Sequence, residues 1–376
     1  MKIDINYSFE RIDRNRKRIA AWKNWEYVDR VPVVLGVECR LPLRKRGVSF
    51  KEYFASPEKQ FMHQLLNYKW ILENIDDDRL TDTVLVIKPD FQNVLFAGGF
   101  GAKIGWFDDS PPRCTPVINK PEDINKLKVP SSKDHLWGTY YEWYKRMQEL
   151  KDDIELSFNG VPGEVVVTMG PGVTNLFSTA VELAGDNFYL WLSTNPKECH
   201  RLLEIIMEGI INFERFRREN SPDIDFHLVG EDAAQLISRD MFREFAVPYL
   251  KNIYEEFPGE RQLHMCGQSK HLHEIIIEEL EIDYFNGLGR DVPPEEAAKT
   301  LGGKVRISGN VDPMIVESGS EEEIRGEIRK ALEYFAPLGG YMLQDGYNLT
   351  PDTPLENINL FMDEAKKYGL PKVTVS

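Results

Sequence analysis

The chain has 376 residues, of which 42% are hydrophobic and 11% aromatic, and its formal net charge is −15. This composition supports a large packed core and excludes a disordered chain. The acidic balance argues against nucleic-acid binding, because neutralising phosphates requires clustered Lys and Arg.

The sequence also argues against a membrane protein. No apolar run approaches the roughly 20 residues that span a bilayer, and no apolar signal core follows Met1. The four cysteines, Cys39, Cys114, Cys199 and Cys266, lack the paired spacing of a disulfide framework. We therefore expect a soluble, cytoplasmic protein with reduced thiols.

The N-terminal part of the chain is predicted to begin with a helical extension over residues 1–30. Its main element is an amphipathic helix around Phe9 to Trp25. The next segment, "RVPVVLGVECR", is an apolar, β-branched run that is typical of a buried strand. It supplies the first strand of the predicted sheet, near Val31.

Capping residues and periodicity define the next elements. A helix is expected near Ser56 to Asn74, because Ser56 suits the N-cap position and Pro57 suits the first turn. A strand is predicted at Thr83 to Ile87. Residues 91–130 are rich in Gly, Phe and Pro and show no clear period, so they form an irregular loop, a cap or an inserted hairpin.

From about Glu164 the pattern becomes regular, because short apolar runs lead through turns to helical segments. The six runs are "EVVVTMG", "DFHLVGED", "RQLHMCG", "DYFNGLG", "KVRISGN" and "YMLQDG". Three of the predicted helices begin near Asn175, Asp240 and Lys270. The others are predicted to span Lys197 to Glu219, Pro294 to Thr300, Ser320 to Phe335 and Leu355 to Tyr368.

These six runs and the two upstream strands make the eight strands of a (β/α)8 barrel. A doubly wound sheet would need a reversal of strand order that nothing marks, and no GxGxxG follows a strand. We therefore predict an α/β protein with a TIM-barrel fold. Because no linker is evident, residues 1–376 are expected to form a single domain.

Catalytic groups of such barrels lie at the carboxyl ends of the strands. His264 and Cys266 end one strand and are two residues apart, so their side chains share a face. Imidazole and thiolate suit Zn²⁺, which often leaves one position open in catalytic sites. The alternative is a small buried cysteine beside a satisfied core histidine. His271 and His273, on the following helix, are expected to be exposed.

Carboxylates end two other predicted strands on the same rim. Glu231 and Asp232 follow one strand and Asp345 ends the last. Each suits a catalytic or metal-binding role, but helix caps and turns use the same residues. Arg40, in "CRLPLRKRG", fits a clamp for an acidic substrate, or it belongs to a solvated loop.

These motifs resemble the uroporphyrinogen decarboxylase superfamily from about Val31 to Gly369, and members of that superfamily are (β/α)8 barrels. The resemblance is carried by "GPGVTNLFSTAVELAGDNFYLWLSTNPKECHRLLE", "EDAAQLISRDMFREFAVPYLK", "LHMCG", "ISGNVDP" and "GGYMLQDGYNLTPDTPLENI". The last three together are quite specific.

The resemblance implies one of two activities. The decarboxylases hold the carboxylates of an acidic tetrapyrrole with two arginines of an RQAGR segment and use no metal. In the equivalent "GVECRLP", Arg40 remains and the first arginine is absent, while the acid of the second strand is at best Asp90. Decarboxylation of uroporphyrinogen type, in porphyrin biosynthesis, is therefore the alternative function.

The other branch contains the cobalamin-dependent methyltransferases and O-demethylases, which bind Zn²⁺ through HxC and a further cysteine. His264 and Cys266 match the first two ligands. In "QDGYNLTP" this chain has Tyr347, with Asp345 two residues earlier, where the family has its third cysteine. The favoured function is zinc-dependent transfer of a methyl group from an aryl methyl ether, alcohol, amine or thiol to or from a corrinoid protein.

The site prediction assigns metal binding to His264, Cys266 and Asp345, catalysis to Glu231, Asp232 and Arg40, and substrate binding to Arg40, Asp90, Asn310 and Tyr347. Glu38 and Cys39 are further candidates for the metal shell. The aromatic loop from Phe91 to Trp106 would provide apolar walls. The predicted cofactors are Zn²⁺ and a corrinoid carried by a partner protein. A small-molecule substrate and a second copy in a homodimer complete the expected partners.

Overall fold

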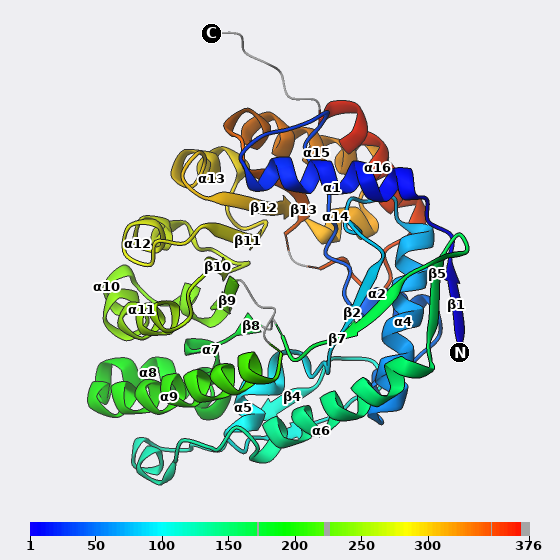
Figure 1. The fold of residues 1–376 in the computed structure, drawn as a ribbon. Coiled ribbons are helices and arrows are strands. Elements are labelled where there is room, and N and C mark those ends of the chain that lie inside the picture. The colour runs from blue at the N-terminus through cyan, green and yellow to red at the C-terminus, as the bar shows by residue number, and fades with distance from the viewer. Residues whose placement is uncertain (171–172, 222–225, 347, 370–376) are drawn as a thin grey trace.

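The computed structural model describes residues 1–170, 173–221, 226–346 and 348–369, and it alternates strands with helices (Figure 1). The strands are β1 (Lys2–Ile5), β2 (Val84–Ile87), β3 (Lys103–Gly105), β4 (Arg113–Thr115), β5 (Glu155–Phe158), β6 (Val161–Pro162), β7 (Glu164–Val167), β8 (Val173–Thr174), β9 (Phe226–Gly230), β10 (Glu260–His264), β11 (Tyr284–Leu288), β12 (Arg306–Val311) and β13 (Tyr341–Asp345).

The α-helices are α1 (Phe9–Lys23), α2 (Arg40–Lys45), α3 (Phe50–Tyr53), α4 (Pro57–Asn74), α5 (Leu95–Gly99), α6 (His135–Leu150), α7 (Phe177–Ala184), α8 (Asn187–Thr194), α9 (Pro196–Asn220), α10 (Arg239–Phe245), α11 (Val247–Glu256), α12 (His273–Glu278), α13 (Pro294–Thr300), α14 (Pro313–Ser318), α15 (Glu321–Phe335) and α16 (Leu355–Tyr368). Short 3₁₀ turns are η1 (Gln92–Val94), η2 (Pro121–Lys126), η3 (Lys151–Asp153), η4 (Asp232–Leu236), η5 (Lys270–Leu272) and η6 (Ala336–Leu338).

The largest sheet is parallel, and its strand order, β8-β9-β10-β11-β12-β13, follows the chain. A parallel bridge from Val33 to Leu343 adds the predicted first strand beside β13. β2 and β7 form a separate parallel pair. Helices lie outside this curved arrangement (Figure 1). The protein therefore has a TIM-barrel-like α/β fold. Among the described residues, the ladder does not join β7 to β8.

The predicted first strand is reduced to the single bridge at Val33, because side chains take the place of a neighbouring strand. The amide of Val33 donates to the Asp78 carboxylate at 2.9 Å, and that of Leu35 donates to Asp77 at 3.1 Å. Arg30 pairs with Asp78 in turn, at 2.7 Å. These buried carboxylates satisfy N–H groups that a strand partner would otherwise bind.

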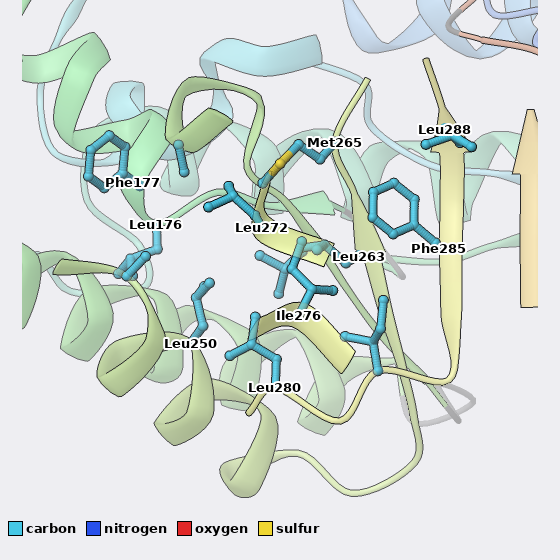
Figure 2. Packing of buried hydrophobic residues seen from close by; sticks show 14 of the residues in the cluster. Leu176, Phe177, Leu250, Leu263, Met265, Leu272, Ile276, Leu280, Phe285 and Leu288 are labelled. Atoms are coloured by element: carbon cyan, nitrogen blue, oxygen red, sulfur yellow. The ribbon is translucent and has the colours of Figure 1, made fainter. Parts of the chain in front are cut away.

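Two-residue alternation along the end of β10 and the two residues that follow it divides the side chains between two environments. Leu263 and Met265 are fully buried in the cluster between sheet and helices, which also contains Leu272 (Figure 2). His264 and Cys266 lie on the opposite face and are half-buried. The packing of the aliphatic residues therefore directs the predicted metal ligands away from the core.

The N-terminal extension contains the predicted helix as α1, and also a strand that was not predicted. β1 pairs in parallel with β5 outside the main sheet. From α1, Trp22 reaches the amino-terminal ends of β11 and β13, where its indole donates to the Gly340 carbonyl at 3.0 Å. Its ring meets that of Tyr284 edge-on, with centroids 5.1 Å apart. This contact lies at the opposite strand ends from His264.

The irregular region at 91–130 contains the inserted hairpin that was one of the predicted alternatives. β3 and β4 pair antiparallel, preceded by η1 and α5 and followed by η2. Among the described residues, no helix combines the length and the apolar character that crossing a bilayer requires. All four cysteines are free thiols.

Candidate metal centre at the carboxyl ends of the strands

Three side chains suited to metal binding meet where β9 and β10 end. One ligand atom from each of Asp232, His264 and Cys266 lies within 4.8 Å of the other two. His264 and Cys266 are the pair predicted from HxC, and Asp232 was predicted as catalytic. The structure therefore supplies a carboxylate to this pair from the neighbouring strand end.

Strand pairing brings the carboxylate to the pair. Gly230 is in register with His264, and the Glu231 amide donates to the His264 carbonyl at 3.0 Å. Asp232 follows immediately, and its Oδ1 accepts the Cys266 amide at 2.8 Å. Its Oδ2 lies 3.7 Å from His264 Nε2. The Asp232 side chain is 48% exposed, so the group opens to solvent on this side.

The donor set fits Zn²⁺. His264 Nδ1 lies 2.8 Å from the carbonyl oxygen of Asn286, an arrangement that leaves Nε2 for a metal. Thiolate, imidazole and carboxylate are all common zinc ligands, and three protein ligands leave a position for substrate. Burial and the neighbouring Asp232 raise the pKa of Cys266. A divalent cation would act in the opposite direction and favour the thiolate.

Asp345, the predicted third ligand, does not join this group. Tyr341 and Leu343 are core residues on the same strand, and alternation places Asp345 on their face. Its side chain is fully buried, and Oδ1 accepts the Gly36 amide at 2.6 Å. Burial raises the pKa of Asp345 to about 7. The carboxylate therefore links β13 to the segment of the first strand.

Glu231, predicted as catalytic, is also fully buried and faces a helix start. Its Oε1 accepts the amides of Leu176 and Phe177 at 2.7 and 3.1 Å, and Oε2 accepts that of Ser178 at 3.1 Å. Burial raises its pKa to about 7 against the effect of these bonds. The structure places Glu231 as an anchor for α7 directly beside Asp232.

Asp90 and Arg40 differ in how far the protein already satisfies them. The Asp90 carboxylate accepts hydrogen bonds from Tyr53 at 2.9 Å and from the Gln92 side chain at 2.8 Å. Arg40 begins α2, and its buried Nε has no hydrogen-bond partner among the described residues. One donor of Arg40 is thus left without a partner in the described part of the chain. The carboxylate clamp itself stays a prediction.

The remaining predicted substrate residues are Asn310 and Tyr347. The Asn310 amide nitrogen donates to the Val292 carbonyl at 2.8 Å, while its buried Oδ1 has no partner among the described residues. Asn310 therefore ties a loop in place and still offers one acceptor. Tyr347 lies outside the described residues.

Glu38 is an acid near the metal group that the sequence offered only as a remote candidate ligand. Desolvation and the nearby Asp90 raise its pKa, whereas Arg40, Asn348 and His264 lower it. The pKa of Glu38, in the segment before α2, thus responds to His264 at the end of β10. The signal in the sequence was its place at the end of the first predicted strand.

An aromatic pocket of about 420 Å³ lies between the hairpin region and α6. Its walls include Phe54, Phe91, Trp106 and Trp143. The Phe91 ring packs against Trp143 with centroids 4.8 Å apart, and Phe54 against Trp106 at 5.0 Å. Residues of the loop from Phe91 to Trp106 line this pocket, but none of the lining residues belongs to the metal group. That the loop supplies apolar walls for the substrate stays a prediction.

The chain belongs to the uroporphyrinogen decarboxylase (URO-D) family, whose sequence model matches residues 14–368. A methylated-thiol–coenzyme M methyltransferase from Methanosarcina mazei is 23% identical over 336 residues, which cover 85% of each chain. A uroporphyrinogen decarboxylase from Chlorobaculum tepidum is 26% identical over 266 residues, or 68% of this chain and 72% of its own. The wider coverage by the first relative agrees with the predicted resemblance to the methyltransferase branch and supports a methyltransferase enzyme.

Solved structures confirm the class of fold. A methyltransferase from Methanosarcina mazei superposes with a TM-score of 0.69 at 20% identity and covers 94% of this chain and 98% of its own. A B12-independent methionine synthase from Shewanella sp. W3-18-1 gives a TM-score of 0.50 at 13% identity, with coverage of 90% and 98%. At these identities, the likeness concerns the fold alone.

Proposed function

We propose that this protein is a zinc-dependent methyltransferase that moves a methyl group from a small methylated substrate to or from a corrinoid protein. The proposal rests on the metal group, in which one ligand atom from each of Asp232, His264 and Cys266 lies within 4.8 Å of the other two. The substrate class comprises aryl methyl ethers, alcohols, amines and thiols. The methyltransferase relative supports the methyl-transfer part of the proposal.

Different residues of this chain have different roles around the metal group. When bound, Zn²⁺ supplies Lewis acidity toward the heteroatom that loses the methyl group. Asp232, His264 and Cys266 hold the ion, and the exposed side of Asp232 leaves room for the substrate. Arg40 orients a carboxylate on the substrate through its unpartnered Nε.

A corrinoid protein is proposed to dock over the rim that carries the metal group. Leu236 is 71% exposed on η4, the turn that begins with Asp232. Met314 is 46% exposed just beyond β12, and Val173 is 41% exposed on β8. Exposed apolar residues on several strand-end segments are suited to contact with another protein.

A homodimer is a second proposed assembly. Light scattering, which measures the molar mass in solution, tests it.

Metal analysis of substituted proteins tests the zinc proposal. We expect one Zn²⁺ per chain, lost on His264→Ala and Cys266→Ser and retained on Cys114→Ser, because Cys114 lies in the hairpin. Asp232→Asn should weaken zinc binding, whereas Asp345→Asn should leave it unchanged. If the Asp345→Asn protein lost zinc and the Asp232→Asn protein retained it, Asp345 would instead be assigned as the ligand. A wild-type protein that binds no zinc would refute the proposal.

Metal-free decarboxylation of an acidic tetrapyrrole is the second candidate function. The observation that favours it is the buried, unpartnered Nε of Arg40, which suits a substrate carboxylate. Release of CO₂ from uroporphyrinogen by the metal-free protein, lost on Arg40→Ala, would establish it. Absence of that release would remove this candidate.

The architecture leads to three further proposals. We propose that eight βα units close into a (β/α)8 barrel, that residues 1–376 form one domain and that the protein resides in the cytoplasm. A single cooperative unfolding transition measured by calorimetry is expected for one domain. Cell fractionation tests the location, and two separated transitions would refute the single domain.

A further inference from the structure

The backbone of β11 holds His264 on the side away from Asp232. Nδ1 of His264 lies 2.8 Å from the Asn286 carbonyl oxygen, an atom that only accepts hydrogen bonds. The proton of the neutral ring must then reside on Nδ1, which leaves the lone pair on Nε2. Nε2 is the nitrogen 3.7 Å from the Asp232 carboxylate. The Asn286 carbonyl therefore selects the tautomer that a metal at this site requires.

This carbonyl reaches the ring where β11 departs from regular pairing. Between Phe285 and Leu288, the register of β11 against β12 shifts, so that β11 advances one residue more than its neighbour. Such a bulge bends a strand and re-aims the groups within it. Asn286 and Gly287 are the two residues inside the bulge.

Gly287 meets two requirements at this point. Its φ of +73° lies in the left-handed region that residues with a side chain adopt rarely. A Cβ atom built on Gly287 would also stand 2.7 Å from His264 Nδ1, which is closer than such contacts allow. The glycine therefore permits both the bend of the backbone and the close approach of the imidazole.

Ser308 on β12 fixes the other side of the bulge. Its hydroxyl oxygen accepts the Gly287 amide at 2.9 Å and the Tyr284 hydroxyl at 2.8 Å. Ser308 is fully buried, and Tyr284 is 6% exposed. A side chain thus replaces the backbone acceptor that regular pairing would offer to Gly287, and Tyr284 orients that side chain.

We propose that Tyr284, Ser308 and Gly287 are positioning residues for the metal ligand His264. They hold the bulge so that the Asn286 carbonyl fixes the ring in its Nδ1-protonated form, with Nε2 toward the metal. The inference rests on the proposed zinc site, but the histidine tautomer is a property of the protein without metal. Groups of this kind commonly change metal affinity about 10–100-fold when they are lost.

Two measurements on Ser308→Ala test the role. Zinc titration against a competing chelator should show affinity lowered about 10–100-fold. Nitrogen NMR of the metal-free protein should show His264 protonated at Nδ1 in the wild type and a mixture of tautomers in the variant. The matched control is Thr174→Val, because Thr174 is a buried hydroxyl that contacts His227 at 3.0 Å, outside the site.

Tyr284→Phe provides a second variant, since it retains the bond between Gly287 and Ser308 and serves if Ser308→Ala does not fold. We expect a smaller loss of affinity in the same direction. Wild-type zinc affinity and an unchanged tautomer in the folded variants would overturn this inference and leave the zinc site standing. A wild-type protein that binds no zinc would overturn both.

Discussion

At the scale of single residues, the face of the strand decides the role of each polar side chain. His264 and Cys266 lie opposite Leu263 and Met265, whereas Asp345 shares its face with the core residues Tyr341 and Leu343. The buried Asp345 carboxylate is left with one oxygen bonded to Gly36 and the other without a partner among the described residues. A negative charge on the Asp345 carboxylate is therefore energetically unfavourable.

This placement predicts how stability depends on pH. Burial raises the pKa of Asp345 from 3.8 to about 7, so the folded protein holds this proton more tightly than the unfolded chain. The resulting stabilisation is complete below about pH 4 and is lost as the pH rises through about 7. Asp345→Asn should remove that loss, because its amide oxygen still accepts the Gly36 amide.

Urea unfolding of both proteins between about pH 4 and 8 measures the effect. Across this pH range, the difference in free energy of unfolding between wild type and Asp345→Asn should change by on the order of 2–4 kcal/mol, at about 1.4 kcal/mol per pKa unit. Glu323→Gln is a control for an exposed acid, since its carboxylate caps α15 at the surface. Parallel pH profiles of wild type and Asp345→Asn would contradict the prediction.

His273 shows where a residue-scale prediction is wrong. Helical spacing placed it in solvent, but it is 1% exposed and bonds Ser269 at 3.1 Å and Thr300 at 2.7 Å. The segment begins with the 3₁₀ turn η5, whose period differs from that of an α-helix, and this change rotates His273 toward α13. The neighbouring His271 bonds the Ile237 carbonyl at 2.9 Å.

At the scale of elements, Glu231 joins the end of β9 to the start of α7. A carboxylate at a helix start satisfies free N–H groups and interacts well with the helix dipole. Glu231→Ala should lower the free energy of unfolding by about 2–3 kcal/mol, because it leaves the amides of Leu176, Phe177 and Ser178 unpaired.

Urea denaturation of Glu231→Ala measures that loss, and Glu323→Ala is the matched comparison. Glu323 serves the capping box of α15 at the surface, where water replaces the lost bonds. We therefore expect Glu323→Ala to lower the free energy of unfolding by clearly less than Glu231→Ala does. Equal losses in the two variants would show that burial adds nothing to the role of Glu231.

Sequence periodicity located most elements that pack directly on the sheet. Ser56 caps α4 with Pro57 in its first turn, and Ser320 caps α15, as their spacing indicates. The prediction omitted β1, β5 and α6, and also the shorter helices α2, α3, α8 and α14. β1 pairs with β5, about 150 residues later in the chain, and buries Ile3 and Ile5 against α4, and such distant contacts leave no local pattern.

At the scale of the whole molecule, the rim around the metal group should act as a docking surface. Leu236→Asp places a charge on its most exposed apolar side chain. We expect the KM for a corrinoid protein to rise at least about tenfold, which is 1.4 kcal/mol, with zinc content unchanged. Steady-state methyl transfer at varied corrinoid-protein concentration measures this.

Val28→Asp is the control for that substitution. Val28 is 60% exposed and follows Tyr27, whose hydroxyl accepts the Tyr341 amide at the amino-terminal end of β13, opposite the end that carries the metal group. Val28→Asp should leave the KM unchanged. An equal rise in both variants, or none with Leu236→Asp, would place the partner elsewhere on the protein.

The sequence by itself determined the alternation of strands and helices and the HxC pair at one strand end, because periodicity and two-residue spacing are local properties of a chain. Only the tertiary structure decided which carboxylate meets that pair. The register of β9 against β10 brings Asp232 to His264, and alternation along β13 turns Asp345 toward Gly36. Register and facing depend on contacts between distant segments, which no local spacing records.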